Sequence, residues 1–316
     1  MNTLLARLRA LAHQPRTARR DAQLLRLLTK APEDTDWDLL SDYLRQHALI
    51  APEKLAALPL IHQALLNHTS WREPTSGLEM IWIPSGRFLF GPLETQQRVT
   101  LPGYAIARHP VTNADWDRFT RATSYTPHDP SPSDNGYLEH RQEHTEALQR
   151  RPDHPVVNVS YIDALHYSRW AGLNLPTVAL WEKAARGADG RTYPWGERAP
   201  DALLANIRSE HSVPIRQYEK TRTAYGCQDM AGNVADWCHP EALYAPDELP
   251  PPIEDVPGSD VDPYGWPSYR GGHYRSSVSQ LRVHQDRAMR AERRTAWCSL
   301  RPIWLPLEPP THTRSS

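Results

Sequence analysis

The chain has 316 residues, enough for one large domain with a smaller one, or for two modest domains. Its 36 basic and 37 acidic residues give a net charge of −1, which argues against a generic nucleic-acid or membrane-surface binder. Thirty prolines and eleven tryptophans beside three phenylalanines predict irregular, loop-rich structure anchored by tryptophan clusters.

No apolar run approaches the roughly 20 residues that a membrane-spanning helix needs. Arg7 and Arg9 interrupt the N-terminal apolar run too early for the core of a signal peptide. The three cysteines, Cys227, Cys238 and Cys298, fit a reducing compartment, and their spacing matches no zinc pattern. We therefore expect a cytoplasmic protein without a membrane partner, whose cysteines are buried small hydrophobic residues.

Residues 1–70 carry leucines at helical spacing and predict four short amphipathic helices, the last from Glu53 to Leu66 after Pro52. The apolar stripes of such helices must be buried against each other or against a partner. We expect a small all-α domain that acts as an adaptor and binds a partner protein.

From about residue 78 to 306 the pattern changes to short strands and helices separated by loops rich in proline and glycine. Strands are predicted at 80–83 and 87–90, and helices at 113–122, 161–171 and 178–186. The expected N-terminal caps of these helices are Asn113, Ser160 and Thr177. The polar stretch 126–153 and the proline-rich stretch 239–268 are predicted loops, and 307–316 is a predicted disordered tail.

Several stretches of this second part follow one another in the order found in the formylglycine-generating enzyme (sulfatase-modifying factor) family. The stretches that carry the resemblance are 80–91, 109–113, 154–164, 175–187, 229–237 and 269–272. The resemblance implies an α+β fold of the C-type-lectin-like kind, with a small twisted antiparallel sheet, flanking helices and little other regular structure. It also makes Trp181, Tyr193, Trp195 and Trp237 core residues.

Oxidases that resemble this chain bind copper through two cysteines, five residues apart, which follow a Gly-Gly pair. Counted from Gly271 and Gly272, those positions are Ser276 and Leu281, and neither can supply a thiolate. The resemblance therefore implies the scaffold without the oxidase chemistry, and copper is not expected. The alternative is a divergent oxidase that uses Cys238 or Cys298 in another geometry.

Two other chemistries lack support in the sequence. An iron site of the ergothioneine-synthesis type needs three convergent imidazoles, and no histidines in residues 1–70 have that spacing. Ser276 and Ser277 have His273 and His284 nearby in the sequence, but no G-x-S-x-G elbow accompanies them.

The resemblance also implies a structural calcium site built from hard oxygen ligands. The matching positions are Asn206, the carbonyl of Ile207, Asn233, the carbonyl of Val234, and Asp236. Asp236 occupies a position at which the family has glutamate, and its side chain is one methylene shorter. In the alternative interpretation, these residues only make turns and local hydrogen bonds.

Residues 270–301 hold eight arginines beside Asp286 and Glu292, a formal charge of +6, whereas 240–262 hold seven acidic residues and no basic one. The two blocks either pair with each other or leave the arginines to an anionic partner. We assign Arg282, Arg294 and Arg301 to the fold, because the family often has arginine there. The predicted ligand-binding residues are His273, Tyr274, Arg275, Ser276, Ser277, Arg287, Arg290 and Arg293.

The function expected from these features is non-catalytic binding of a protein or peptide, in which an anionic ligand fits best and nucleic acid is not expected. The chain is similar in this respect to the variable proteins of diversity-generating retroelements, which use the same fold and display diversified residues in the same C-terminal segment. A purely structural role in a larger assembly is a third interpretation.

Overall fold

In the computed structural model of the chain, the residues that can be described are 70–126, 151–239 and 266–305. The predicted helical domain at 1–70, the tail at 307–316 and most of both predicted loops lie outside these ranges. The proposed domain boundaries therefore stay predictions. No helix in the described ranges is long and apolar enough to cross a membrane.

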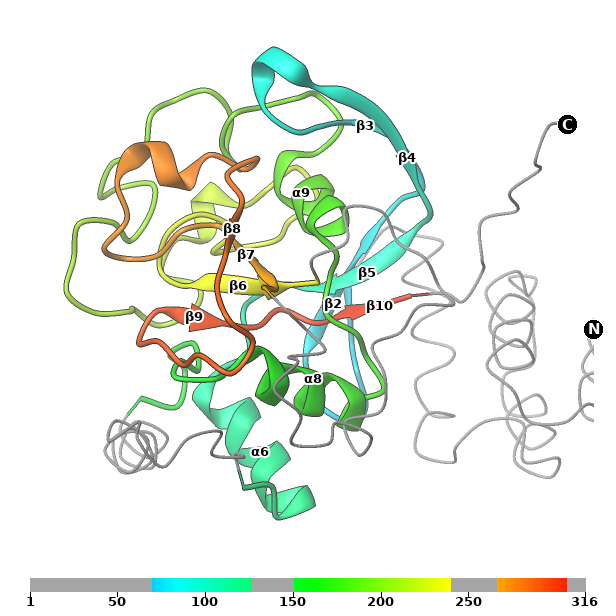
Figure 1. Cartoon of the computed structure of the whole chain (residues 1–316), viewed down its shortest axis with the longest axis vertical. Coiled ribbons are helices and arrows are strands. Elements are labelled where there is room, and N and C mark those ends of the chain that lie inside the picture. The colour runs from blue at the N-terminus through cyan, green and yellow to red at the C-terminus, as the bar shows by residue number, and fades with distance from the viewer. Residues whose placement is uncertain (1–69, 127–150, 240–265, 306–316) are drawn as a thin grey trace, which may run out of the picture.

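One four-stranded antiparallel sheet joins the beginning and the end of the described chain, in the order β1-β2-β5-β10. Its strands are β1 (Ser70–Arg72), β2 (Glu79–Ile83), β5 (Tyr104–Ala107) and β10 (Ile303–Trp304). Ile106 of β5 faces Ile81 on one side and Ile303 on the other. Segments about 200 residues apart thus share one sheet (Figure 1).

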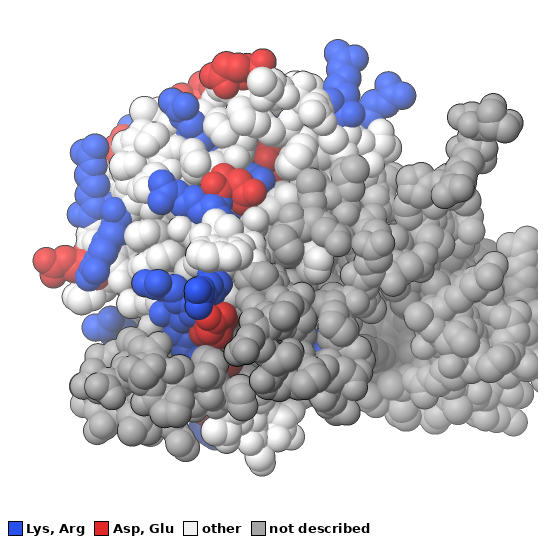
Figure 2. All heavy atoms as spheres, viewed as in Figure 1, with Lys and Arg blue, Asp and Glu red and all other residues white. Residues whose placement is uncertain are grey.

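A second sheet, in the order β8-β7-β6-β9, carries the segment in which we expected the binding residues. Its strands are β6 (Ala235–Cys238), β7 (Ser268–Arg270), β8 (Arg287–Ala288) and β9 (Cys298–Ser299). The pair β6–β9 is parallel, and the other two pairs are antiparallel. In the same view, basic side chains with acidic ones interspersed are exposed where β7 and β8 lie (Figure 2).

The remaining regular structure of the described residues is a hairpin, three α-helices and three short 3₁₀ turns. The hairpin strands are β3 (Gly86–Phe90) and β4 (Gln97–Leu101). The helices are α6 (Asn113–Thr123), α8 (Tyr161–Trp170) and α9 (Val178–Arg186). The 3₁₀ turns are η1 (Leu93–Thr95), η2 (Glu219–Thr221) and η4 (Val278–Leu281). Few helices and several small sheets with long connections confirm the predicted α+β class.

The helix starts follow from local sequence, with one correction. Ser160 and Thr177 cap α8 and α9 as predicted. The cap of α6 is Thr112 and not Asn113, because the Thr112 hydroxyl accepts the N–H of Asp115 at 3.2 Å. The Asp115 carboxylate in turn accepts the Thr112 N–H at 3.1 Å, which completes a capping box. Asn113 is the first helical residue, and its side-chain amide donates to the carbonyl of Arg151.

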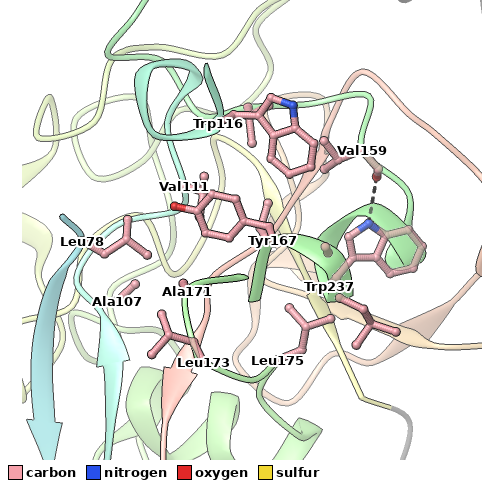
Figure 3. Close-up of a cluster of buried hydrophobic side chains, with 14 of the residues drawn as sticks. Leu78, Ala107, Val111, Trp116, Val159, Tyr167, Ala171, Leu173, Leu175 and Trp237 are labelled. Carbon is pink, nitrogen blue, oxygen red and sulfur yellow. Dashed lines mark hydrogen bonds between the residues drawn. The ribbon is translucent and has the colours of Figure 1, made fainter. Parts of the chain in front are cut away.

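Aromatic side chains fill much of the space between these short elements (Figure 3). The rings of Trp116 and Tyr167 stack with centroids 5.7 Å apart, and the indole of Trp237 donates to the carbonyl of Val159 at 3.0 Å. Large rings bury much area per residue, which helps a fold with little regular structure. Trp181, Trp237 and Tyr193 are buried as predicted, whereas Trp195 is half-buried and stacks on Tyr193.

A buried arginine ties the two sheets together. The guanidinium of Arg301 lies 2.8 Å from the carboxylate of Asp236 in β6 and donates to the carbonyls of Ala107 and Arg108 at the end of β5. The same group donates to the carbonyls of Gln228 and Asp229. Because these acceptors belong to separate elements, one fully buried side chain fixes their relative positions.

Two more charged contacts join helices to distant segments. Arg270 in β7 lies 2.9 Å from Glu182 in α9, and Arg186 lies 3.0 Å from the same carboxylate. Arg294 lies 2.8 Å from Asp163, the residue that completes the capping box of α8. Arg294 and Arg301 therefore serve the fold, as predicted, whereas Arg282 is exposed.

Candidate functional site

The two positions at which the resemblance implied copper-binding cysteines are occupied by buried structural residues. Ser276 is 2% exposed, and its hydroxyl accepts the backbone N–H of His273 at 3.0 Å. Leu281 is fully buried in a small apolar cluster with Tyr193 and Ile207. One position thus closes a turn, the other fills a core, and neither presents a reactive group.

The preceding Gly-Gly pair folds this turn tightly. Gly271 and Gly272 have φ angles of +92° and +64°, and residues other than glycine rarely adopt positive φ angles. A Cβ atom on Gly272 would lie 3.2 Å from the Ser276 hydroxyl and 3.0 Å from the carbonyl of Gln280. The positive φ angles and the close backbone contacts of this turn explain why both positions are glycine, without any catalytic role.

The three cysteines are free and completely buried. Burial raises the pKa of the Cys227 thiol and holds the pKa values of Cys238 and Cys298 well above the ordinary value. Metal ligation requires the thiolate, and a raised pKa disfavours it. In the β6–β9 register, Cys298 lies opposite Ala235, three positions along the strand from Cys238. The sulfur atoms therefore behave as core groups.

The structure brings together two of the predicted calcium ligands. The side-chain amide of Asn206 donates to the amide oxygen of Asn233 at 3.2 Å, and the Asn233 N–H donates to the Asn206 carbonyl at 2.9 Å. The amide oxygen of Asn233 also accepts the N–H of Val213, and that of Asn206 accepts the hydroxyl of Ser209. Both side-chain oxygens are therefore engaged by protein donors.

The carboxylate of the predicted calcium set is engaged elsewhere. Asp236 is fully buried, and one of its oxygens accepts the indole N–H of Trp181 at 2.9 Å and the guanidinium of Arg301 at 2.8 Å. Burial raises the pKa of Asp236, and Arg301 opposes that effect. The other oxygen of Asp236, Oδ1, is buried and has no hydrogen-bond partner, but the Arg301 guanidinium already balances the carboxylate charge that a calcium ion would need. Calcium binding stays an untested prediction.

The predicted ligand-binding residues divide by exposure. Arg275, Ser277, Arg287, Arg290 and Arg293 are exposed, and His273 is partly buried. Tyr274 and Ser276 are 4% and 2% exposed, so they have little surface for a partner. Tyr274 supports the exposed residues from the interior. Its hydroxyl donates to the carbonyl of Ala296, and its ring centroid lies 5.5 Å from the guanidinium carbon of Arg275, a cation–π contact.

An aromatic row lies between these arginines. The ring of His273 stacks on Trp297 with centroids 4.4 Å apart and planes inclined by 18°, and Trp297 contacts Tyr269 at 5.1 Å. Burial, together with the charges of Arg287 and Arg275, lowers the pKa of His273 to about 4, so the imidazole is neutral at pH 7. We name the five residues His273, Trp297, Arg275, Arg287 and Arg293 the arginine–aromatic face.

Among the described residues, few acidic groups neutralise the arginines of this face. No ion pair between described residues engages Arg275, Arg287 or Arg293, and Arg290 approaches Glu292 only to 3.8 Å. Figure 2 shows basic groups exposed in this part of the molecule, and the described acidic residues between them are few. Free guanidinium groups beside an aromatic stack form a surface suited to carboxylate or phosphate groups.

The sequence predicted the arginines and His273 of this face but missed Trp297, on which His273 stacks. Trp297 lies in the predicted segment 270–301, and Trp266, which is 63% exposed, lies four residues before that segment. The available signal was tryptophan within a strongly basic stretch. What the sequence lacked was the register Tyr269↔Arg287, which brings the aromatic and basic residues to one sheet edge.

Comparison with known proteins identifies the family. Residues 67–304 match the model of the sulfatase-modifying factor enzyme 1-like domain, and the chain belongs to this family. It is 30% identical over 237 residues to the formylglycine-generating enzyme of Mycobacterium tuberculosis, with 55% of this chain and 77% of that protein covered.

The chain is also 33% identical over 230 residues to the serine/threonine-protein kinase Pkn1 of Chlamydia trachomatis, covering 66% of this chain. It spans only 35% of the length of Pkn1, and the kinase activity in that name is not carried over.

Two solved structures show the same fold at low identity. PvdO from Pseudomonas aeruginosa superposes with a TM-score of 0.57 at 20% identity, covering 75% of this chain and 98% of that one. Treponema denticola variable protein 1 gives a TM-score of 0.52 at 16% identity, with the same coverage. The chain thus has a formylglycine-generating enzyme among its relatives and shares its fold with a variable protein.

Proposed function

We propose that this domain is a non-catalytic binding module that holds a protein or peptide ligand on the arginine–aromatic face. The observation that carries the proposal is the burial of Ser276 and Leu281. Both positions at which a copper-binding cysteine was implied have become part of a turn and of a core. A serine hydroxyl that closes a turn and a buried leucine supply no thiolate for a copper ion.

The physical character of the face supports a ligand with acidic groups. Arginine presents a planar fork of donors that matches carboxylate oxygens, and it is enriched with tryptophan at the energetic centres of interfaces. Trp297 and neutral His273 provide a flat stacked surface between Arg275 and Arg287. A peptide with acidic side chains beside an aromatic or apolar one fits both parts.

The fold of Treponema denticola variable protein 1 supports a display role on this scaffold. Diversification of the 270–301 segment by a retroelement remains a proposal, and so do a cytoplasmic location and partner binding by residues 1–70. The rival function, a divergent oxidase, requires a thiolate from Cys238 or Cys298. Burial raises the pKa of both, which disfavours that chemistry.

A charge-matched pair of double variants tests the proposal. The probes are fluorescent peptides of equal length, each with one tryptophan and with zero, three or six glutamates. Arg287→Ala/Arg293→Ala removes two charges from the face, and Arg121→Ala/Arg198→Ala removes two exposed charges elsewhere. We expect binding to rise with glutamate number and to weaken at least about tenfold only in the first variant. Equal loss in both variants, or no binding, would reject the proposed face.

A further inference from the structure

A separate cleft of about 270 Å³ lies on elements that do not contribute to the arginine–aromatic face. Four segments line it: the turn and strand edge at 77–79 with Arg72, the link from β5 into α6, and the loops at 152–153 and 215–216. Small-molecule pockets have volumes of about 300–1,000 Å³, so this cleft suits a ligand at the small end.

A buried imidazole without a partner lines this cleft. His109 is 7% exposed, and neither of its ring nitrogens has a hydrogen-bond partner. Its Nδ1 atom lies 4.0 Å from the Asp229 carboxylate, whose nearer oxygen is also unpartnered. Leaving a buried polar group unpaired costs about 1–3 kcal/mol. A bound ligand that supplies a partner would recover part of that cost.

The carboxylate fixes the chemical character of the imidazole. Asp229, held at φ +54°, faces Nδ1 and favours the proton on that nitrogen. Nε2 is then left as a hydrogen-bond acceptor. Burial lowers the pKa of His109, and Asp229 opposes the effect, so the ring is neutral at pH 7. A neutral acceptor in a cleft is matched by an N–H or O–H donor on the ligand.

Some of the charged groups around the cleft already have hydrogen-bond or ion-pair partners within the protein. The Glu79 carboxylate accepts the hydroxyl of Ser70 at 2.8 Å and pairs with Arg108 at 2.9 Å. Asp115 is engaged by the cap of α6. These two acids are therefore committed to the fold.

Three other lining groups keep capacity for a ligand. Arg216 is 58% exposed and approaches Glu79 only to 3.6 Å, and Arg72 uses one of its N–H groups on the carbonyl of Gly77. Asp153 is exposed, and its side chain has no ion pair with another described residue. The cleft thus offers cationic donors and an anionic acceptor, with apolar walls from Leu78, Pro110 and Ile215.

We propose that this cleft binds a small zwitterion of the free amino-acid class. The ligand carboxylate is held by Arg216 and Arg72, and its side chain lies on the apolar wall. The ammonium group faces Asp153 and donates to Nε2 of His109 once a shift of the ring uncovers that buried nitrogen. A ligand with only one charge would leave either the two arginines or Asp153 unpaired. The site therefore favours a zwitterion over a simple acid or a simple amine.

Calorimetric titration of the full chain with each of the twenty amino acids, and with propionate and propylamine as single-charge probes, tests this proposal. We expect at least one amino acid to bind, with both single-charge probes at least about tenfold weaker. Arg216→Gln, at an exposed position, and His109→Phe, of similar size, should each weaken binding about tenfold or more. Arg287→Ala/Arg293→Ala should leave it unchanged, which separates this site from the arginine–aromatic face.

The proposal is overturned if no amino acid binds, or if propionate or propylamine binds as well as the amino acid does. It also fails if the folded Arg216→Gln variant binds like the unchanged chain. Thermal unfolding of each variant shows whether it is folded. Because Arg216 is exposed, Arg216→Gln should fold, and it tests the site even if His109→Phe does not fold.

Discussion

The hydroxyl of Ser276 accepts the backbone N–H of His273 at 3.0 Å, and the Ser276 N–H donates back to the His273 carbonyl at 2.8 Å. This reciprocal pair makes a tight turn of the segment that follows Gly271 and Gly272. It draws Ser276 below the surface and leaves Arg275 outside. The same turn sets His273 on Trp297, so one local contact organises the arginine–aromatic face.

The packing of the second implied cysteine position predicts a large stability effect. Leu281→Ala should lower the free energy of unfolding by about 2–5 kcal/mol, because it opens a cavity between Tyr193 and Ile207. Leu203→Ala, the same substitution at a position that is 80% exposed, is the control and should change it by less than about 0.5 kcal/mol. Urea unfolding measures both. A small loss for Leu281→Ala would show that this position is not part of the core.

The pair Asp236–Arg301 predicts an asymmetric response. Asp236→Asn should destabilise the fold by about 3–5 kcal/mol, because it leaves the guanidinium of Arg301 buried without its counter-charge. Asp189→Asn breaks the exposed pair with Arg191 and should cost about 0–1 kcal/mol. Denaturant unfolding of the two variants compares these values. Equal losses would contradict the structural role assigned to Asp236, and tolerance of Asp236→Asn would reopen a ligand role for it.

The neutral state of His273 predicts a pH dependence. Its pKa is lowered to about 4 from an ordinary value near 6.5, so between these values the unfolded chain binds more protons than the folded chain. His273 therefore contributes stability above pH 6.5 that is lost as the pH falls toward 4. Unfolding free energies at pH 7, 5.5 and 4.5 should fall less in His273→Phe than in the unchanged chain.

Other histidines also have lowered pKa values, so His273→Phe should flatten only part of this slope. His166 is a matched control, since its pKa is lowered by burial on a helix away from the face. His166→Phe should flatten the slope too, but only His273→Phe should alter binding of the glutamate-rich probes. If the slope of His273→Phe equals that of the unchanged chain, the imidazole is not the buried neutral group described above.

Electrostatic binding at the arginine–aromatic face should depend on salt. Exposed guanidinium groups are screened over a Debye length of about 10 Å at 0.1 M salt and about 3 Å at 1 M salt. Affinity for the six-glutamate probe should fall steadily as sodium chloride rises, and the dependence should be shallower in Arg287→Ala/Arg293→Ala. Fluorescence anisotropy at several salt concentrations measures both slopes. If the affinity does not depend on salt, the probe binds through apolar contacts and the electrostatic prediction is wrong.

Features decided by neighbouring residues were predictable from the sequence. The caps Ser160 and Thr177 precede their helices directly, and the cap of α6 was misplaced by one residue because Thr112 and Asn113 are both good caps. The order of motifs also gave the family and the α+β class. Contacts between distant residues were not predictable in this way.

The candidate site illustrates that limit. Asp236 pairs with Arg301, 65 positions away, and this ion pair occupies one oxygen of the carboxylate that was predicted to bind calcium. Tyr274 and Ser276 alternate with exposed residues, and only the fold of the Gly-Gly turn decides which of them face inward. The His109 cleft combines four distant segments, and the sequence marked 109–113 only as part of the family resemblance and not as a site.

The measurement that tests the central claim most directly is copper content and oxygen consumption of the purified chain, with a cysteine-containing peptide of the sulfatase type as substrate. With Ser276 and Leu281 buried and all three thiols held protonated, we predict no stoichiometric copper and no turnover above a metal-only control. Stoichiometric copper with turnover that Cys238→Ser or Cys298→Ser abolishes would contradict the binding-module proposal and establish an oxidase.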